Sequence, residues 1–261
     1  GNATAGIGAL AGCAMSSKYV KGCSAKDVKV VLSGEGADEL FGGYRIYHEP
    51  TSLAGYQKLP RWLRKAAARL VSALPFDFKG KSFLIRGSKT LEERFIGNAY
   101  MFTQKEKDKL LKTIPATDPA GKTAAYYNRC QGLDDVTRMQ YLDINRWMVG
   151  DILLKADRMS MAHSLELRVP FLDKEVFSVA SRIPAKHRIA EGTTKYAMRL
   201  AAKRHLPEAS TSRPKLGFPV PVRVWLRQEP YYNRVKEAFL SPAAEKFFNT
   251  AELLRFLDQH Y

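Results

Sequence analysis

The segment SGEGADEL, residues 33–40, contains two glycines and three carboxylates. Gly34 and Gly36 can adopt positive φ without strain, which lets the backbone approach a ligand closely. The segment follows a short apolar run and precedes a predicted helix start, so its free N–H groups favour an anion such as phosphate. The GxxxxGK[ST] and GxGxxG phosphate-binding patterns are both absent from the sequence.

The carboxylates Glu35, Asp38 and Glu39 would repel a phosphate unless a cation lies between them. Mg²⁺ is commonly held by one or two carboxylates together with phosphate oxygens and water. One of these acids is therefore a candidate Mg²⁺ ligand, and another could accept a proton from an amine. The alternative for Asp38 and Glu39 is a favourable interaction with the macrodipole of the following helix. We prefer that alternative for Glu39 and a functional role for Glu35.

The run before this segment predicts the strand that positions it, over residues 27–33. Val28, Val30, Val31 and Leu32 are apolar on both faces, as in a central strand of a parallel sheet covered on both sides. A lone strand cannot satisfy its backbone groups, and 164–172 is the only other short candidate strand. We therefore expect further partner strands before residue 1, in a larger α/β protein with a parallel sheet.

The rest of the sequence predicts a predominantly α-helical chain with this one clear strand. Residues 3–20 are small and apolar enough for a buried helix. Further helices are predicted over 60–73, 91–100, 104–112, 122–130, 134–148, 150–163, 173–182, 194–205, 230–239 and 250–259. Loops are predicted near 75, near 115 and in the Pro-rich segment that begins at 211.

The net charge of +16 favours an anionic partner, which nucleic acid, nucleotide phosphates or a membrane surface would each satisfy. The densest basic stretch, KLPRWLRKAAARL from Lys58, predicts a helix with Arg61, Arg64, Lys65 and Arg69 opposite an apolar side. We prefer an ordinary solvated face there over an RNA or membrane patch. No apolar stretch reaches the roughly 20 residues of a membrane helix, and no signal peptide is visible. Three cysteines without CxxC spacing favour a reducing compartment, hence the cytoplasm.

Four segments together resemble the synthetase domain of the glutamine-hydrolysing asparagine synthetases, which are ATP pyrophosphatases. The segments are VVLSGEGADELFGGY (30–44), LLKADRMSMAHSLELRVPFLD (153–173), GTTKYAMRLAAKRHLP (192–207) and RPKLGFPVPVRVWL (213–226). The resemblance covers nearly the whole chain, in the order of the family's motifs. It implies an adenine nucleotide α-hydrolase-like fold, with the end of the nucleotide-binding core at 1–50 and a mostly helical remainder at 51–261.

The resemblance implies that ATP adenylates the side-chain carboxylate of aspartate and that ammonia then displaces AMP to give asparagine. Ser33 and Gly34 match positions that contact the nucleotide, which Gly36 would also approach. Glu35 matches the acid implicated in forming the acyl-adenylate and handling the amine. Asp38 matches a ligand of the Mg²⁺–pyrophosphate complex.

Two later segments are expected to add site residues. Asp157 and Arg158 match family positions that line the active site, although Asp151, Lys155 and Arg158 could instead form an ion-pair ladder along one helix. Lys195 matches the family lysine that contacts pyrophosphate. It follows Thr193 and Thr194, either of which is the predicted N-cap, so it opposes the helix dipole.

Two parts of the family pattern are absent from these residues. The SGGxDS pyrophosphate loop is missing, as is the glutaminase domain that begins with a nucleophilic cysteine and supplies ammonia. We therefore expect the isolated chain to be weakly active or inactive. A homodimer of the full-length protein is a candidate assembly, and neither a nucleic-acid nor a membrane partner is expected. Alternatives are a synthetase acting on another carboxylic acid and a basic helical polyanion-binding module.

Overall fold

The computed structural model describes residues 29–98, 101–113, 119–212, 221–259 and 261. Within them lies a small parallel sheet in which β1 (Val30–Leu32) pairs with β2 (Glu166–Arg168), Val31 lying opposite Leu167. The predicted strand and the weaker candidate at 164–172 are thus both confirmed, and they are partners. The predicted helix at 3–20, Cys13, Cys23 and most of the Pro-rich segment lie outside the described residues.

Both faces of β1 are largely uncovered within the described residues. Leu32 is 74% exposed and Val30 is also exposed, so within β1 only Val31 is partly buried. Helix α10 (Leu154–Met161) packs against β2, and no described residue covers the outer side chains of β1. Burial of β1 by further strands before residue 1 stays a prediction.

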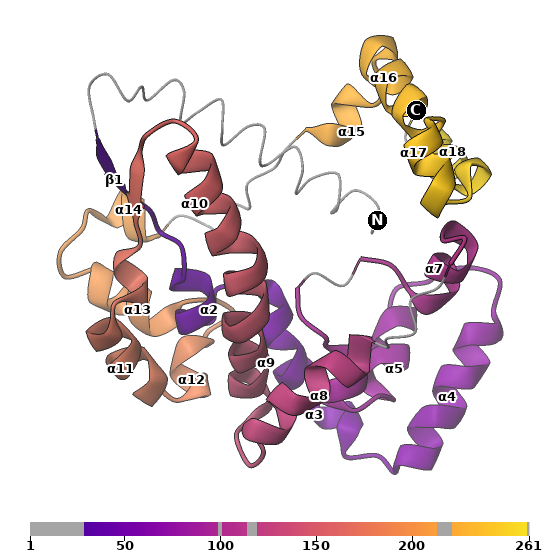
Figure 1. The fold of residues 1–261 in the computed structure, drawn as a ribbon. Helices are drawn as coiled ribbons and strands as arrows, with labels where there is room; N and C mark the ends of the chain where they lie inside the picture. Colours follow the sequence, from indigo (N-terminus) through magenta and orange to yellow (C-terminus); the bar gives the residue numbers. More distant parts are fainter. Residues whose placement is uncertain (1–28, 99–100, 114–118, 213–220, 260) are drawn as a thin grey trace.

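The helices around the sheet centre on α2 (Ala37–Phe41), which packs against neighbours on several sides (Figure 1). These neighbours come from later parts of the chain. They are α9 (Asp135–Asp143), the π-helix η2 (Ile144–Leu153), the 3₁₀ turn η3 (Pro170–Leu172), α11 (Lys174–Arg182) and α13 (Tyr196–Ala202). The short helices α12 (Ala185–Arg188) and α14 (Glu208–Thr211) complete this region.

The remaining helices form the other side of the molecule in Figure 1, with α15 to α18 gathered at its upper right. In chain order they are η1 (Arg45–His48), α3 (Glu49–Gln57), α4 (Arg61–Ala73), α5 (Lys81–Gly87), α6 (Leu91–Arg94), α7 (Gln104–Leu110), α8 (Pro119–Arg129), α15 (Val222–Trp225), α16 (Glu229–Phe239), α17 (Pro242–Phe247) and α18 (Thr250–Asp258). Helix α18 packs against α7. Among the described helices, none is both long and apolar enough to span a bilayer.

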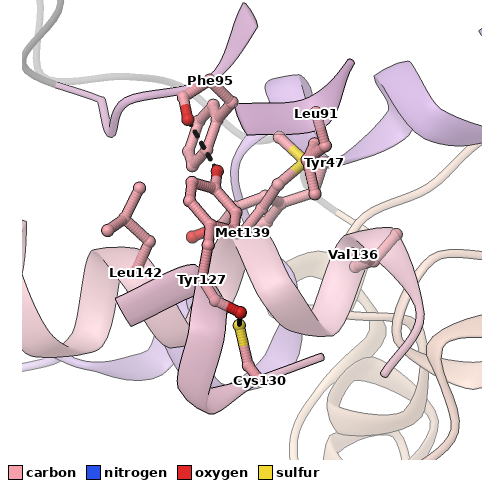
Figure 2. Packing of buried hydrophobic residues seen from close by; sticks show 8 residues of the cluster. All are labelled: Tyr47, Leu91, Phe95, Tyr127, Cys130, Val136, Met139 and Leu142. Atoms are coloured by element: carbon pink, nitrogen blue, oxygen red, sulfur yellow. Dashed lines mark hydrogen bonds between the residues drawn. The ribbon is translucent and has the colours of Figure 1, made fainter. Parts of the chain in front are cut away.

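A buried cluster joins η1, α6, α8 and α9 (Figure 2). It consists of Tyr47, Leu91, Phe95, Tyr127, Cys130, Val136, Met139 and Leu142. The Tyr127 hydroxyl donates a hydrogen bond to the Phe95 carbonyl over 2.6 Å, which ties α8 to the end of α6. The predicted helix at 91–100 is therefore wrong after Arg94: Phe95 is extended, and Gly97 has a φ of 104° that a helix cannot continue.

The two helices predicted at 134–148 and 150–163 are one continuous helical segment, because η2 links α9 directly to α10. A π-helix places its hydrogen-bond partners five residues apart, so side chains drift away from the 3.6-residue pattern. Met148 and Ile152 are buried as that pattern predicts, but Val149 is 59% exposed. The predicted break near residue 149 is thus wrong.

Gly36 stands between β1 and α2 and is buried. Its φ is 88°, and a Cβ placed on it would collide with the side chain of Leu172. We expect Gly36→Ala to lower the free energy of unfolding by about 2–3 kcal/mol through left-handed strain and overpacking. Urea unfolding measures the loss. Gly34→Ala is the control, because a Cβ there meets nothing within 4 Å, and an equal loss in both variants would contradict the argument.

Candidate functional site

The predicted ligand-binding segment lies where expected, at the carboxyl end of β1. The amide of Ser33 donates to the Arg168 carbonyl over 2.8 Å, which extends the pairing with β2 by one step. The chain then turns through Gly34 and Glu35, whose amide lies 3.4 Å from the Ser33 hydroxyl oxygen, before α2 begins at Ala37. The turn leaves Gly34 exposed and Ser33 and Glu35 half-buried, so a ligand at the strand end could meet all three.

The structure brings Lys195 to this turn. Its Nζ lies 2.9 Å from Oδ1 of Asp38 on α2, and both side chains remain partly exposed. Lys195 is itself the N-cap of α13, in a left-handed conformation with a φ of 54°, so the prediction that Thr193 or Thr194 is the cap is wrong. Thr193 instead closes a tight turn with Ala190 through two backbone hydrogen bonds. A left-handed lysine is strained, which fits a position fixed by its ion pair.

The Asp38 carboxylate is seated against the backbone of Gly43. The Gly43 amide donates to the Asp38 carbonyl over 2.7 Å, and a Cβ on Gly43 would fall on the Asp38 carboxylate. Oδ1 is buried and lies against Nζ of Lys195. One carboxylate oxygen is what a Mg²⁺ ion shared with phosphate needs from the protein. The described residues contain no cluster of three or more metal-binding side chains, so any metal here would take most of its ligands from elsewhere.

Glu35 lies in an environment that favours its protonated form. Burial is the main cause of a raised pKa of this carboxyl, and the nearby charge of Glu39 raises it further. The positive charge of Lys155 partly offsets these effects, while Asp38 adds a smaller upward contribution. A carboxyl whose pKa is raised can hold a proton at a higher pH than a surface acid, which suits proton transfer.

Glu39 is a buried member of the site that its position at a helix start did not reveal. Its Oε1 accepts a hydrogen bond of 2.5 Å from the Tyr44 hydroxyl. Its backbone carbonyl accepts one from Gln140 Nε2, and Gln140 in turn accepts a 2.6 Å bond from the buried Arg188. Glu39 is therefore fixed by α9 and α12, beyond any interaction with the dipole of α2. The only sequence feature that could have indicated this role of Glu39 is its position shortly before a segment rich in aromatic residues.

Asp157 and Arg158 are not joined to this group by any side-chain contact that the structure records among its described residues. Both side chains are exposed on α10, the helix that packs against β2. The first step of the predicted ladder is present, since Lys155 Nζ lies 3.4 Å from Asp151 Oδ2. Lys155 also acts electrostatically on Glu35, a role that the ladder did not predict.

Comparison with known proteins decides the family. A model of the asparagine synthase family matches residues 13–261, which include the whole turn, Asp38 and Lys195. The chain belongs to the asparagine synthase family. Its predicted resemblance to asparagine synthetases is therefore confirmed.

Three relatives show how similar this chain is to known asparagine synthetases and how much of each protein the similarity covers. Asparagine synthetase [glutamine-hydrolyzing] 1 of Bacillus subtilis is 46% identical over 236 residues, which cover 90% of this chain and 37% of that protein. A putative asparagine synthetase [glutamine-hydrolyzing] of Mycobacterium tuberculosis is 49% identical over 239 residues, covering 90% and 36%. The human asparagine synthetase [glutamine-hydrolyzing] is 36% identical over 108 residues, covering 38% and 19%. The chain spans little more than a third of the first two relatives, and no solved structure matches it.

Proposed function

We propose that this chain contributes part of a site at which ATP adenylates the side-chain carboxylate of aspartate and ammonia converts the product to asparagine. The observation that carries the proposal is the Lys195–Asp38 pair beside Glu35, at the carboxyl end of β1. Open α/β sheets bind their ligands at that end of their strands. The asparagine synthase match over the same residues supplies the reaction.

In the first step an oxygen of the aspartate carboxylate attacks the α-phosphorus of ATP, and the bond to pyrophosphate breaks. The turn would hold the nucleotide through the Ser33 hydroxyl and the exposed backbone of Gly34, while the buried Gly36 would shape the turn. Lys195 would place its ammonium against the leaving pyrophosphate, where negative charge develops. Mg²⁺, held in part by Asp38, would supply further neutralisation of the phosphate charge.

In the second step the nitrogen of ammonia attacks the activated carbonyl, a C–N bond forms and AMP leaves. The nitrogen must lose a proton as it becomes an amide, and Glu35 is the acid placed to take it. We further propose that Asp157 and Arg158 line the same site from α10. The planar guanidinium of Arg158 would suit a carboxylate or phosphate.

Several finer assignments belong to the same proposal. In the full-length protein the ammonia would come from glutamine through a glutaminase domain, the location would be cytoplasmic, and a homodimer is a candidate assembly. Residues 1–50 would end the nucleotide-binding core, with 51–261 as the helical remainder. A related synthetase acting on another carboxylic acid is the alternative.

Exchange of labelled pyrophosphate into ATP tests the first step in the protein that carries this chain. Aspartate-dependent exchange supports the proposal, whereas exchange with a different carboxylic acid and not with aspartate favours the alternative. We expect the isolated chain to give little or no exchange, because the SGGxDS loop is absent from these residues. Robust exchange by the isolated chain would contradict the view that it holds only part of the site.

Replacing Lys195 with methionine should lower the rate of pyrophosphate exchange by about 100-fold, because a charge aimed at the leaving group is lost. Methionine keeps most of the side-chain length, so packing changes little. Lys186→Met, which removes an exposed lysine from the neighbouring α12, is the matched control and should leave the rate unchanged. Equal rates in the two variants would exclude Lys195 from the chemistry.

A further inference from the structure

Residues 58–89, which we name the α4–α5 arm, expose an unusual amount of apolar surface. Helices α4 and α5 pack against each other, and α4 lies at the outer edge of the molecule, on the opposite side from β1 in Figure 1. Trp62 is 71% exposed and Leu70 is 73% exposed. The other large apolar side chains that the arm exposes are Leu59, Leu63, Leu74, Phe76, Phe78 and Phe83.

Helix α4 has one packed side and a second apolar side that none of the described residues covers. Ala68 is buried, with Ala67 and Val71 partly buried beside it, and these face the rest of the structure. Trp62 and Leu70 lie eight residues apart, with the exposed Ala66 between them, so they form one stripe along the helix. The sequence pattern favoured an ordinary solvated basic face for this helix over a membrane patch. It did not predict that an apolar stripe would be exposed beside that face.

Positive charge flanks the stripe. Lys65 is exposed one turn after Trp62, and Arg69 is exposed just before Leu70. Between residues 58 and 89 the only acidic residue is Asp77, whereas the basic residues are Lys58, Arg61, Arg64, Lys65, Arg69, Lys79, Lys81, Arg86 and Lys89. Asp77 is already paired with Lys81 over 3.3 Å. Arg61 and Arg86 already pair with Glu93 and Glu49 outside the arm. The exposed apolar stripe is therefore flanked mainly by Lys65 and Arg69.

The charge pattern decides between occupants of this surface. A two-fold contact between copies of the chain would bring the same basic patch against itself, with no acidic residue on the arm left to pair with it. A single-stranded nucleic acid would satisfy the basic residues and could stack bases on the aromatic rings, but it offers no apolar phase for the exposed aliphatic side chains of Leu63 and Leu70. An anionic bilayer satisfies both, because apolar side chains enter the headgroup boundary while lysine and arginine stay at the phosphates.

We propose that the α4–α5 arm docks the protein on the surface of an anionic phospholipid bilayer. Trp62 and Leu70 enter the boundary between headgroups and acyl chains, with Phe76 and Phe78, whose ring centroids are 6.3 Å apart, entering beside them. Lys65 and Arg69 lie against lipid phosphates. This is binding to one leaflet, by residues outside the proposed catalytic site, and it does not depend on the reaction proposed above.

Vesicle flotation of the full-length protein that carries this chain tests the proposal. We expect the protein to float with mixed phosphatidylglycerol and phosphatidylcholine vesicles and not with phosphatidylcholine alone, and to be released by high salt. Lys65→Glu/Arg69→Glu should weaken binding by tenfold or more, since each basic residue near such a surface contributes about fivefold. Trp62→Ser/Leu70→Ser should weaken vesicle binding by a similar factor. It should also abolish the blue shift of tryptophan fluorescence that we expect vesicles to cause in the wild type.

Matched controls separate the arm from general charge and hydrophobicity. Arg227→Glu/Arg234→Glu makes the same charge change on exposed residues around α16, and Val224→Ser/Leu240→Ser removes exposed apolar side chains there. Both should bind vesicles nearly as well as the wild type. The proposal fails if the protein does not bind anionic vesicles or if the arm and control variants lose binding equally. It also fails if Trp62→Ser/Leu70→Ser converts a dimer to a monomer in light scattering, or if the arm variants lose only binding to an oligouridylate probe.

Discussion

Replacing Glu35 with glutamine is expected to lower the rate of asparagine formation by about 100-fold to 10,000-fold, the range for removing a group that transfers a proton. Glutamine has nearly the same shape and can still accept a hydrogen bond, but it cannot take a proton from the attacking nitrogen. The loss should fall mainly on the amide-forming step. Pyrophosphate exchange, which reports the earlier step, should fall less. Parallel measurements of exchange and of asparagine release with ammonia as the donor would show the difference.

The pH dependence provides a second measure of the same role. Because burial raises the pKa of Glu35, its basic form is lost at a higher pH than for a surface carboxyl. The wild-type rate should therefore rise with pH through that raised pKa, and the Glu35→Gln variant should lack this rise. Glu166→Gln is the matched control, since Glu166 is exposed on β2 and pairs with Arg168 over 2.8 Å. A Glu35→Gln variant with wild-type rate and pH profile would remove Glu35 from the mechanism.

Local sequence was sufficient to predict the turn at the end of β1. Apolar residues before Ser33 and glycines after it specify a strand, a tight turn and a helix start, whatever else the chain does. Helices α4, α11, α16 and α18 were likewise predicted to within a residue or two, because each has a regular apolar stripe and clear end signals. Helices α3 and α5 were missed. Pro50 and Gly55 interrupt the pattern of α3, and α5 is a single short element after a loop-like segment.

Contacts between distant segments could not be predicted from pattern alone. The Glu39 carbonyl is held by Gln140, and that residue is held by Arg188, so three separate parts of the chain define one acid. The family resemblance assigned both Lys195 and Asp38 to the pyrophosphate, but it predicted neither their ion pair nor the left-handed backbone at Lys195. The π-helix was not predicted either, since the two helices expected at 134–148 and 150–163 left a break in its middle.

Asp143 stands where that π-helix begins, and it is the most enclosed carboxyl in the described core. Its Oδ2 accepts hydrogen bonds from the Tyr47 hydroxyl over 2.6 Å and from Asn98 Nδ2 over 2.7 Å, while Oδ1 accepts one from the Asn98 amide. The ring of Tyr47 lies against that of Tyr44, which donates to Glu39. Asp143 thus links the end of α9 to the residues beside the proposed site.

Burial raises the pKa of Asp143 to about 7, although its hydrogen bonds from Tyr47 and Asn98 oppose the rise. In the unfolded chain its pKa returns to about 4. Below pH 4 both states carry the proton. Between pH 4 and 7 only the folded state keeps the proton on Asp143. The stabilisation that the protonated carboxyl gives to the folded state is therefore lost as the pH rises, and above pH 7 none of it remains. The difference of about three pKa units corresponds to about 4 kcal/mol.

Asp143→Asn is therefore expected to be less stable than the wild type at pH 4 and to close that gap, or reverse it, by pH 8. The asparagine amide has one acceptor oxygen where the carboxyl group has two, so part of the hydrogen bonding from Tyr47 and Asn98 is lost, which should cost about 1 kcal/mol at every pH. It has no charge to bury, so the loss of stability with rising pH should disappear. Urea unfolding at several pH values would measure the difference in the free energy of unfolding between variant and wild type, which should change by about 4 kcal/mol across the range.

Asp77→Asn is the control, since the side chain of Asp77 is 97% exposed and its difference from wild type should stay nearly constant. A pH-independent difference for Asp143→Asn would show that folding does not raise the pKa of this carboxyl.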